Sequence, residues 1–366
     1  MSARTTDGRF MRRALTLALR GRGTTAPNPM VGAVVVRDGQ VVGEGCTQPA
    51  GGPHAEVQAL SAAGVLAAGA SIFVSLEPCN AFGRTPPCVD AIIAAGVRRV
   101  VFAASDPNPA MRGGADRLRA AGIEVLGGIE ALAALDQNPA FHHQFASDRP
   151  FVTLKLARTL DGAITDSRRV PTWLTGPAAR REVHRQAAEP AGVAVGVGTA
   201  IADDPQLTAR TLPRPRTTPA RIVFDRTGRL PLDSHLVRTA RETPVLLVAT
   251  HLEAHRRSAF EASGVHVMLA DGLEAQLLML RATGIGSIYC EGGAALADAL
   301  LGAGLVDRLV IFTAPVRLGA NALRPLQSGA HVPVEHTARH RLVSHRRLGD
   351  DLMAIYDLTS SVHRTR

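Results

Sequence analysis

Four residues in the first quarter of the chain have the types and the spacing of a zinc-dependent hydrolytic site. His54 and Glu56 stand two positions apart, Cys79 follows Pro78, and Cys88 comes after eight intervening residues. One imidazole and two thiolates give zinc three protein ligands and leave a fourth position for water, as a catalytic zinc requires. Glu56 can reach that water without binding the metal and can pass its proton to a leaving amine. The pattern predicts zinc-dependent deamination of an amine on a pyrimidine-like ring.

Taken one at a time, these residues have simpler interpretations. A single histidine is seldom a metal ligand, and Cys79 and Cys88 alone fit the burial of small apolar side chains. A structural zinc site normally closes its shell with a fourth protein ligand, and no fourth cysteine or histidine stands next to this set. The joint pattern therefore favours a catalytic metal. A zinc-stabilised binding module without chemistry is the alternative, and it predicts that Glu56 is dispensable.

Helices and short apolar strands alternate around these four residues. We expect helices at residues 9–19, 55–66, 89–95, 115–121 and 129–145, and strands at residues 31–36, 41–42, 72–76, 99–103 and 123–126. The turn Asp38-Gly39 joins the first two strands as a hairpin. His54 then lies where a loop enters a helix, and Cys79 follows a buried strand. The alternation predicts a layered α/β domain over residues 1–148.

A second α/β series follows the short polar segment at residues 147–150, and we assign it to a second domain, residues 149–366. Its expected strands are residues 151–156, 194–197, 221–224, 245–249, 265–269, 287–290, 309–314, 340–343 and 351–356. Glycine turns at residues 196–199 and 291–293 follow two of these strands. Backbone amides of such turns can bind phosphate, although either turn alone is more often an ordinary loop.

The composition limits the classes of protein that fit. At 366 residues, 46% hydrophobic and 20% charged, the chain is long enough for two globular domains. No apolar run approaches the length of a membrane span, and four cysteines are too few for a disulfide framework, so we expect a cytoplasmic protein without a membrane partner. The net charge of +9 is dispersed, and two tyrosines offer little base stacking, which disfavours a nucleic-acid base deaminase. Tight, salt-sensitive tRNA binding would support that alternative.

Residues 76–88, LEPCNAFGRTPPC, resemble the deaminase signature of the RibD family of bifunctional riboflavin-biosynthesis proteins, including the long spacing between its cysteines. Residues 28–32 and 106–109 are similar to two further blocks of that domain. The resemblance implies that His54, Cys79 and Cys88 bind zinc and that Glu56 is the proton shuttle. It also implies a substrate pocket lined by Asn28, Arg84, Asp106 and Asn108.

The second half is similar to the family's reductase domain, which resembles dihydrofolate reductase and takes hydride from NADPH. The matching blocks are residues 154–157, 160–162, 172–175, 198–210 and 291–296. The implied NADPH contacts are Ala157, Trp173, Thr199, Asp203, Gly293, Ala294, Ala295, Leu296, Ala297, Asp298 and Ala299. The implied substrate contacts are Leu207, Arg210 and Glu291, together with Lys155, the only lysine of the chain. Without the resemblance, Trp173 would be interpreted as a core aromatic residue and Asp203 as part of a solvated turn.

Three positions depart from the family's usual residues. Ala81 replaces a histidine, Pro171 a serine and Ala187 an arginine. The last two positions belong to the family's reductase substrate site, where an arginine can form a strong charge-assisted hydrogen bond to phosphate. The arginines that could replace the missing one are Arg180, Arg181 and Arg185. Either the phosphate is held differently, or the reductase half has another substrate or weak activity.

The function that these observations support is a bifunctional enzyme with zinc and NADPH as cofactors. It would deaminate 2,5-diamino-6-(5-phosphoribosylamino)pyrimidin-4-one and then reduce the ribosyl group to ribityl. The expected partner is this small phosphorylated pyrimidine, with no nucleic acid, and we expect a homo-oligomer. An alternative is a paralogue in specialised metabolism that deaminates a related pyrimidine and has an altered reductase half.

Overall fold

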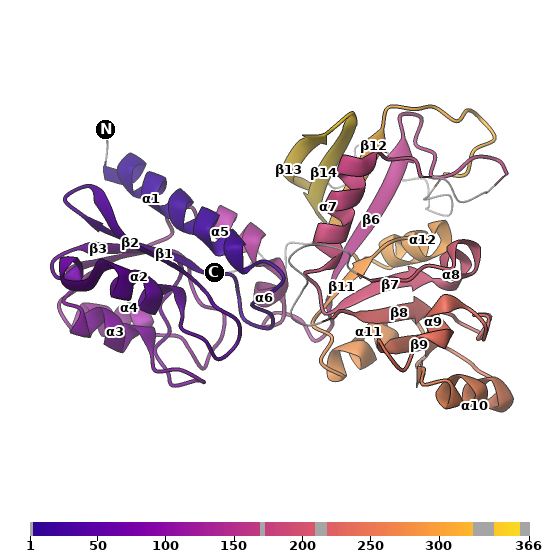
Figure 1. The fold of residues 1–366 in the computed structure, drawn as a ribbon, viewed down its shortest axis with the longest axis horizontal. Helices are drawn as coiled ribbons and strands as arrows, with labels where there is room; N and C mark the ends of the chain where they lie inside the picture. The colour runs from indigo at the N-terminus through magenta and orange to yellow at the C-terminus, as the bar shows by residue number, and fades with distance from the viewer. Residues whose placement is uncertain (1–2, 169–172, 209–217, 325–339, 359–366) are drawn as a thin grey trace. The chain divides into compact units, whose positions relative to one another are not determined.

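The computed structural model describes residues 3–168, 173–208, 218–324 and 340–358 (Figure 1). These residues form two compact units, of which the first spans Met1–Phe145 and the second begins at Ala146. Each unit is built around its own β-sheet with helices packed against it. None of the helices in the described part of the chain combines the length and the apolarity needed to cross a lipid bilayer.

The first unit contains a five-stranded sheet with the order β2-β1-β3-β4-β5. Its strands are β1 (Gly32–Arg37), β2 (Gln40–Cys46), β3 (Ser71–Leu76), β4 (Arg99–Ala104) and β5 (Glu124–Gly127). Strand β1 pairs antiparallel with β2 and β3, whereas β3, β4 and β5 run parallel. The parallel strands β3 and β4 are buried along almost their whole length because helices cover both faces of the sheet, as Figure 1 shows.

Helices α1 (Ala3–Ala18) and α5 (Ala131–Gln137) lie on one face of this sheet, and α2 (Ala55–Ala63), α3 (Cys88–Ala94) and α4 (Gly114–Ala120) lie on the other (Figure 1). Short 3-10 helices occupy Leu19–Gly21 and Gly64–Ala67. Helix α2 approaches β2 closely at two glycines. A Cβ atom on Gly43 or Gly45 would stand 2.2 Å from the carbonyl oxygen of Ala59 or Ala55, respectively. These glycines allow the helix that follows His54 to lie directly on the sheet.

The helix expected at residues 129–145 is wrong, because the structure has two helices there, α5 and α6 (Pro139–His143). Asn138 separates them with φ −123° and ψ 47°, outside the helical region. Pro139 has no amide hydrogen to continue α5 and disfavours a helical conformation for the residue before it. The Asn138 side chain bonds instead to the amide and carbonyl of Met30, at 2.8 and 2.9 Å.

The second unit contains a nine-stranded sheet with the order β10-β9-β8-β7-β11-β6-β12-β14-β13. Its strands are β6 (Phe151–Thr159), β7 (Gly192–Gly196), β8 (Ala220–Phe224), β9 (Val245–Ala249), β10 (His266–Leu269), β11 (Ser287–Cys290), β12 (Arg308–Ala314), β13 (Arg341–Leu348) and β14 (Asp351–Asp357). In this order, all strands from β10 at the edge through β12 run parallel to one another. Strand β14 pairs antiparallel with β12, and β13 pairs antiparallel with β14 at the other edge. The helices are α7 (Pro177–Ala187), α8 (Val197–Asp203), α9 (His235–Arg238), α10 (Ala254–Ala262), α11 (Leu273–Ala282) and α12 (Ala294–Gly302).

Strand β11 lies between β7 and β6 although it is far from both in sequence. In the registers of these pairs, Cys290 of β11 stands beside Ala194 of β7 and Leu154 of β6, and all three belong to the buried core. The carboxyl ends of the three strands therefore meet at one edge of the sheet. In an open α/β sheet, a crevice forms at the edge where the strand order reverses. The predicted α/β class is confirmed for both units, and this edge is where the second unit is expected to bind a ligand.

Candidate functional site

The three predicted metal ligands of the first unit come together in the structure. His54 Nδ1 lies 3.2 Å from the Cys88 sulfur and 3.6 Å from the Cys79 sulfur. All three ligand atoms lie within 4.8 Å of one another. With Zn–N near 2.0 Å and Zn–S near 2.3 Å, a tetrahedral zinc separates its nitrogen and sulfur ligands by about 3.5 Å. The donor set and its spacing therefore fit zinc, with His54 binding through Nδ1.

Each ligand is positioned by an element end or a neighbouring bond. His54 is the residue before α2, and its Nε2 lies 3.2 Å from the Thr85 hydroxyl, which orients the ring so that Nδ1 faces the sulfurs. Cys79 follows β3, and Cys88 is the first residue of α3, where its amide donates to the Cys79 sulfur at 3.3 Å. Cys79 and Cys88 are 9% and 0% exposed, so the thiolates are shielded from water.

The loop that carries Cys79 is held by residues that the sequence analysis did not single out. The Glu77 carboxylate accepts a hydrogen bond from the Ala115 amide at 3.1 Å, and the Glu77 amide donates to Ala104. A Cβ atom on Gly114 would stand 1.9 Å from the carbonyl oxygen of Pro78, so only glycine fits there. For Glu77, the available signal in the sequence was a carboxylate directly before Pro78-Cys79. For Gly114 there was no signal, because nothing in the sequence indicates that it lies against Pro78.

The thiol and imidazole groups of this set perturb one another. The hydrogen bond from Cys88 lowers the pKa of Cys79 to about 4, so this thiol is ionised at neutral pH. The same contact, together with burial, raises the pKa of Cys88. The hydrogen bond with Cys79 raises the pKa of His54. A cation favours the deprotonated form of all three groups, so zinc binding is coupled to proton release from this set.

Glu56 lies in the first turn of α2, two residues from His54, and is only 4% exposed. Burial raises the pKa of its carboxyl to about 7, and the charge of Cys79 adds to the shift. A carboxyl that titrates near neutral pH can both accept and donate a proton under working conditions. The position and environment of Glu56 thus suit the proton-shuttling role that the sequence predicts.

The four residues expected to line the first pocket have different environments. Asp106 follows β4 and is 6% exposed, and burial raises its pKa to about 6, with contributions from the charges of Glu77 and Cys79. Its carboxylate accepts a hydrogen bond from the Asn108 amide at 2.9 Å, which fixes the turn that carries both residues. Arg84 and Asn28 are exposed. Arg84 is adjacent in the chain to Thr85, which contacts His54.

A large cleft, of about 1560 Å³, opens at the carboxyl edge of the second sheet. It is lined by residues of β6, β7, β8, β9 and β12 and by the segments that follow β7, β8, β9 and β11. The lining includes twelve of the predicted site residues, namely Lys155, Ala157, Trp173, Thr199, Asp203, Leu207, Glu291, Gly293, Ala294, Ala295, Leu296 and Ala299. The structure thus brings together residues that lie more than a hundred positions apart in the sequence.

Some predicted residues do not belong to this cleft. Ala297 is fully buried in the core beneath α12, and Asp298 is not among the lining residues. A helix turns about 100° per residue, so a run of seven successive residues cannot all face one cleft. Arg210 and Pro171 lie outside the described residues. The core interpretation of Trp173 is wrong, since its side chain is 71% exposed at the cleft.

Charged groups converge inside the cleft. The Lys155 ammonium lies 3.9 Å from a Glu291 carboxylate oxygen, and both side chains are largely buried. Burial raises the pKa of Asp203, while the positive charge of Lys155 opposes that shift. Lys155 therefore lies in the middle of β6 close to two carboxylates, and its ammonium lines the cleft, where it can meet a polar group of a bound molecule.

The glycine turns shape the middle of the cleft. Gly293 has φ +102°, and a Cβ atom on it would stand 2.7 Å from the Thr199 hydroxyl. The Gly196 amide faces the Gly292 carbonyl at 3.5 Å, so the turns after β7 and β11 lie against each other. Helix α12 begins immediately after Gly293, and its first residues, Ala294 to Leu296, line the cleft, where the free amides of a helix start can bind an anion. Leu207 has φ +51°, a strained conformation for a leucine that places it at the cleft wall.

Several cleft residues were missed by the sequence analysis. Arg226, Thr227 and Arg229 line the cleft after β8, and Gln276 lines it from α11. The usable signal was a polar run directly after a short apolar strand, because ligands bind beyond the carboxyl ends of parallel strands. Gln276 had no such signal. Its amide bonds to Thr250 and Ala270 only because α11 packs beside β9 and β10.

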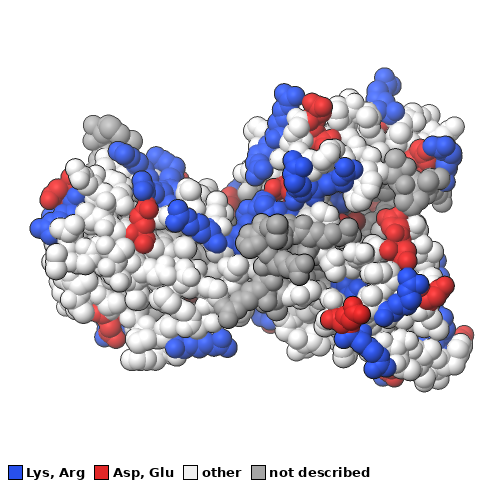
Figure 2. Space-filling view, in the orientation of Figure 1, with Lys and Arg blue, Asp and Glu red and all other residues white. Residues whose placement is uncertain are grey.

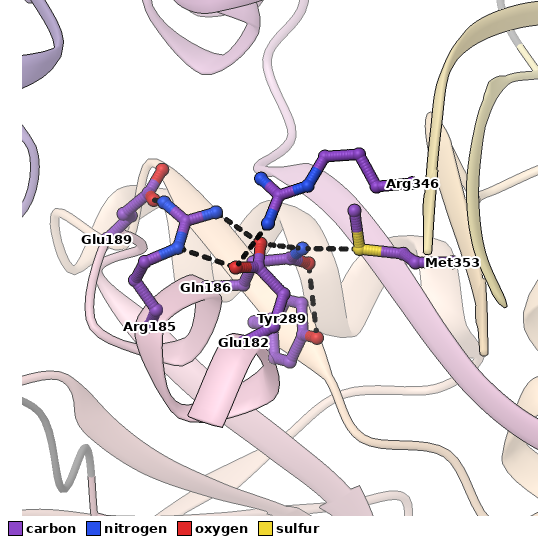
Figure 3. A network of polar contacts seen from close by, with 7 residues as sticks. All are labelled: Glu182, Arg185, Gln186, Glu189, Tyr289, Arg346 and Met353. Atoms are coloured by element: carbon purple, nitrogen blue, oxygen red, sulfur yellow. Dashed lines mark hydrogen bonds and ion pairs between the residues drawn. The ribbon is translucent and has the colours of Figure 1, made fainter. Parts of the chain in front are cut away.

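Helix α7 carries a polar network, built from residues that do not line the cleft (Figure 3). Glu182 is 6% exposed, and its carboxylate accepts hydrogen bonds from Arg185 and Gln186. The same carboxylate forms an ion pair with Arg346. Gln186 in turn accepts a hydrogen bond from the Tyr289 hydroxyl at 3.3 Å and contacts the Met353 sulfur at 3.2 Å. The network ties α7 to β11, β13 and β14 and fixes which helix face points into the cleft.

Comparison with known proteins is consistent with two functional parts. A family model described as cytidine and deoxycytidylate deaminase zinc-binding region matches residues 4–104, and one described as RibD C-terminal domain matches residues 150–354. The riboflavin biosynthesis protein RibD of Aquifex aeolicus is 39% identical over 353 residues, which cover 96% of this chain and 98% of that protein. RibD of Escherichia coli is 41% identical over 340 residues, covering 86% of this chain and 89% of that protein.

Solved structures show the same full-length similarity. Acinetobacter baumannii RibD superposes with a TM-score of 0.84 at 36% identity and covers 97% of this chain and 99% of its own. A Thermotoga maritima protein described as a diaminohydroxyphosphoribosylaminopyrimidine deaminase and 5-amino-6-(5-phosphoribosylamino)uracil reductase also gives a TM-score of 0.84, at 32% identity and the same coverage. Both halves of the chain are thus shared with these proteins, one of which is described as both a deaminase and a reductase.

Proposed function

This chain belongs to the RibD family, and from that premise we infer that it catalyses two steps of riboflavin biosynthesis. The first unit is a zinc-dependent deaminase of 2,5-diamino-6-(5-phosphoribosylamino)pyrimidin-4-one. The second unit is an NADPH-dependent reductase that converts the ribosyl group of the product to ribityl. We propose residues 1–148 and 149–366 as the extents of the two domains. The observation that carries this function is the presence of both sites on one chain that matches bifunctional relatives over nearly its full length.

In the deaminase site, His54, Cys79 and Cys88 would hold zinc, which when bound activates water at neutral pH as a Lewis acid. We propose that Glu56 accepts a proton from that water and delivers it to the departing ammonia. Its buried carboxyl, with a pKa raised to about 7, supports both halves of this transfer. We propose that Asp106, Asn108, Asn28 and Arg84 orient the substrate, and the burial of Asp106 near Cys79 supports its place in the pocket.

In the reductase cleft, NADPH supplies hydride when bound, and the chain's own residues position it. The amides that begin α12 after Gly293 and the turn at Thr199 offer donors for the pyrophosphate. Ala157, Trp173 and Asp203 line the same cleft and are proposed cofactor contacts. Lys155, in the middle of β6, and Glu291, directly after β11, are proposed substrate contacts, because their opposed charges lie 3.9 Å apart and both line the cleft.

The experiment that tests this function supplies the diaminopyrimidine phosphate to the purified chain with and without NADPH. Without NADPH, mass spectrometry should show only the replacement of one amine by oxygen. With NADPH, the same product should gain two hydrogens. A product that keeps both amines in the presence of zinc, or that is never reduced, would contradict the respective half of the function.

The cellular setting and assembly are proposals as well. We propose a cytoplasmic location, which the four free cysteines support because thiolate ligands need a reducing compartment. Self-association of the chain stays a prediction, and light scattering on the purified protein tests it directly. The nucleic-acid base deaminase and the binding module gain no support from the relatives, which are riboflavin-pathway enzymes over the whole chain.

A further inference from the structure

The proposed reductase substrate carries a phosphate, and Ala187 stands where the resemblance to the RibD family implies an arginine. Ala187 is 2% exposed and packs in a small apolar cluster with Val193 and Tyr289, beside the cleft residues Val183 and Leu207. The Tyr289 side chain is also 2% exposed, so its ring fills the space next to the alanine. Position 187 therefore supplies no cation to the cleft, and a substrate phosphate needs another residue to bind it.

Helix α7 offers three arginines, and the structure distinguishes them. Arg185 is held by two carboxylates, with Nε 2.8 Å from Glu182 and Nη1 3.5 Å from Glu189 (Figure 3). Its positive charge is therefore already neutralised on the network side of the helix. Arg181 is exposed and is not among the residues that line the cleft. Arg180 is the one of the three that lines the cleft.

The surroundings of Arg180 leave its hydrogen-bonding groups available. Its guanidinium carbon lies 5.2 Å from the centre of the Trp173 ring, a stacking contact that holds the group without using its N–H donors. Within the described residues, no carboxylate and no hydrogen-bond acceptor engages Arg180. A planar guanidinium with free donors can bind a phosphate through two parallel hydrogen bonds.

Lys155, Arg226 and Arg229, which also line the cleft, differ from Arg180 in their surroundings or their position. Lys155 faces Glu291 at 3.9 Å, so part of its charge is offset. Arg226 and Arg229 follow β8, and two strands, β7 and β11, separate β8 from β6. They therefore lie at the end of the cleft beyond the glycine turns, away from Lys155 and α7. Arg180 belongs to α7, which packs against Ala157 of β6, so Arg180 and its neighbour Trp173 lie on the Lys155 side of the cleft.

We propose that Arg180, stacked on Trp173, binds the phosphate of the reductase substrate, because position 187 carries no cation. The inference rests on the reductase function proposed above and deepens it, because it names the residue that selects a phosphorylated substrate. The Trp173 ring holds the guanidinium in place before the substrate arrives. The phosphate then binds to the free edge of Arg180 rather than to a side chain at the buried position.

The first test compares KM for the phosphorylated substrate and its dephosphorylated analogue in Arg180→Ala, Arg180→Lys and the matched control Arg181→Ala. Loss of a charge-assisted hydrogen bond to phosphate should raise KM for the phosphorylated substrate by about 10- to 150-fold in Arg180→Ala. KM for the analogue should hardly change, Arg180→Lys should recover part of the loss, and Arg181→Ala should match the wild type. An equal rise for both substrates would show a merely structural role and overturn the proposal.

The second test uses the only tryptophan of the chain as a direct probe of binding. Titration with ribose 5-phosphate should change the fluorescence of Trp173 in the wild type, whereas ribose alone should not. Arg180→Ala should lose this response, and Arg181→Ala should keep it. If wild-type chain reduces its substrate and Arg180→Ala binds ribose 5-phosphate normally, the phosphate assignment fails while the reductase function stands. If the wild type reduces nothing, the proposed function fails first.

Discussion

The metal site of the first unit and the cleft of the second unit are built in opposite ways. The metal site takes its chemistry from four side chains between positions 54 and 88, all fixed at the ends of α2, β3 and α3. The cleft takes its shape from backbone turns and from residues spread between Lys155 and Leu323. Side-chain chemistry at short spacing can be identified in a sequence, whereas a surface assembled from distant strand ends cannot.

The two sites also differ in how they treat charge. Glu56 and Asp106 are 4% and 6% exposed, and burial raises the pKa of both carboxyls toward neutral pH. The cleft is open, and Trp173 is 71% exposed at its wall. A buried site can hold a proton for transfer, while an open one can accept two large molecules. The difference predicts that the two activities respond separately to substitutions.

The strongest way to separate the sites is to remove a metal ligand. Cys79→Ser should lower zinc content from about one per chain to near zero and reduce deamination by at least about 1000-fold, because the metal contributes several kcal/mol to the barrier. Reduction of the pre-deaminated substrate should be unchanged. Cys46→Ser is the matched control, since Cys46 is half-buried and is not part of the metal set. A Cys79→Ser protein that keeps its zinc would contradict the ligand assignment.

A smaller loss is expected when the metal stays and only the proton shuttle is removed. Glu56→Gln keeps the shape of the side chain and should retain zinc and fold, but it should lower deamination by at least about 100-fold. Metal analysis and both activity assays on one preparation provide the measurement. If deamination and reduction fell together, the independence of the two sites would be disproved.

In the cleft, the backbone rather than a reactive side chain should be the sensitive feature. Gly293 has φ +102°, and in Gly293→Ala the new Cβ atom would stand 2.7 Å from the Thr199 hydroxyl. Backbone strain of this kind costs about 1 to 3 kcal/mol. We expect KM for NADPH to rise about 5- to 100-fold, with deamination unaffected. Gly302→Ala, at the other end of α12, meets no atom within 4 Å and should behave as the wild type. Equal behaviour of the two variants would show that the turn does not need glycine.

The mildest expected effect concerns stability. Ala187→Arg inserts a charged side chain against Val193 and Tyr289, and overpacking of a core position costs about 1 to 3 kcal/mol. Urea denaturation should show a lower free energy of unfolding for the second unit. KM for the phosphorylated substrate should not decrease. The double variant Ala187→Arg with Tyr289→Leu should recover stability, because it makes room for the new side chain. A single variant with full stability and a lower KM would show that residue 187 can reach the phosphate after all.

The sequence by itself predicted the candidate metal site of the first unit and determined the order of most elements. His54, Cys79 and Cys88 were predicted as a metal set from residue type and spacing, because few side chains bind zinc, and the structure brings the three together. The role of Glu56 beside them stays a prediction. Helix and strand alternation similarly determined the α/β class. The missed break at Asn138 arose because that side chain bonds to Met30, more than a hundred positions away.

Only the tertiary structure decided which residues share the cleft and which way they face. Trp173 was ambiguous between core and surface until its exposure was known, and Ala297 entered the predicted set although it points into the core. The choice among Arg180, Arg181 and Arg185 depended on partners from other elements, such as Trp173 and the Glu182 network. Periodicity and spacing record only neighbours along the chain, whereas packing between strands and helices sets the direction and the partners of each side chain.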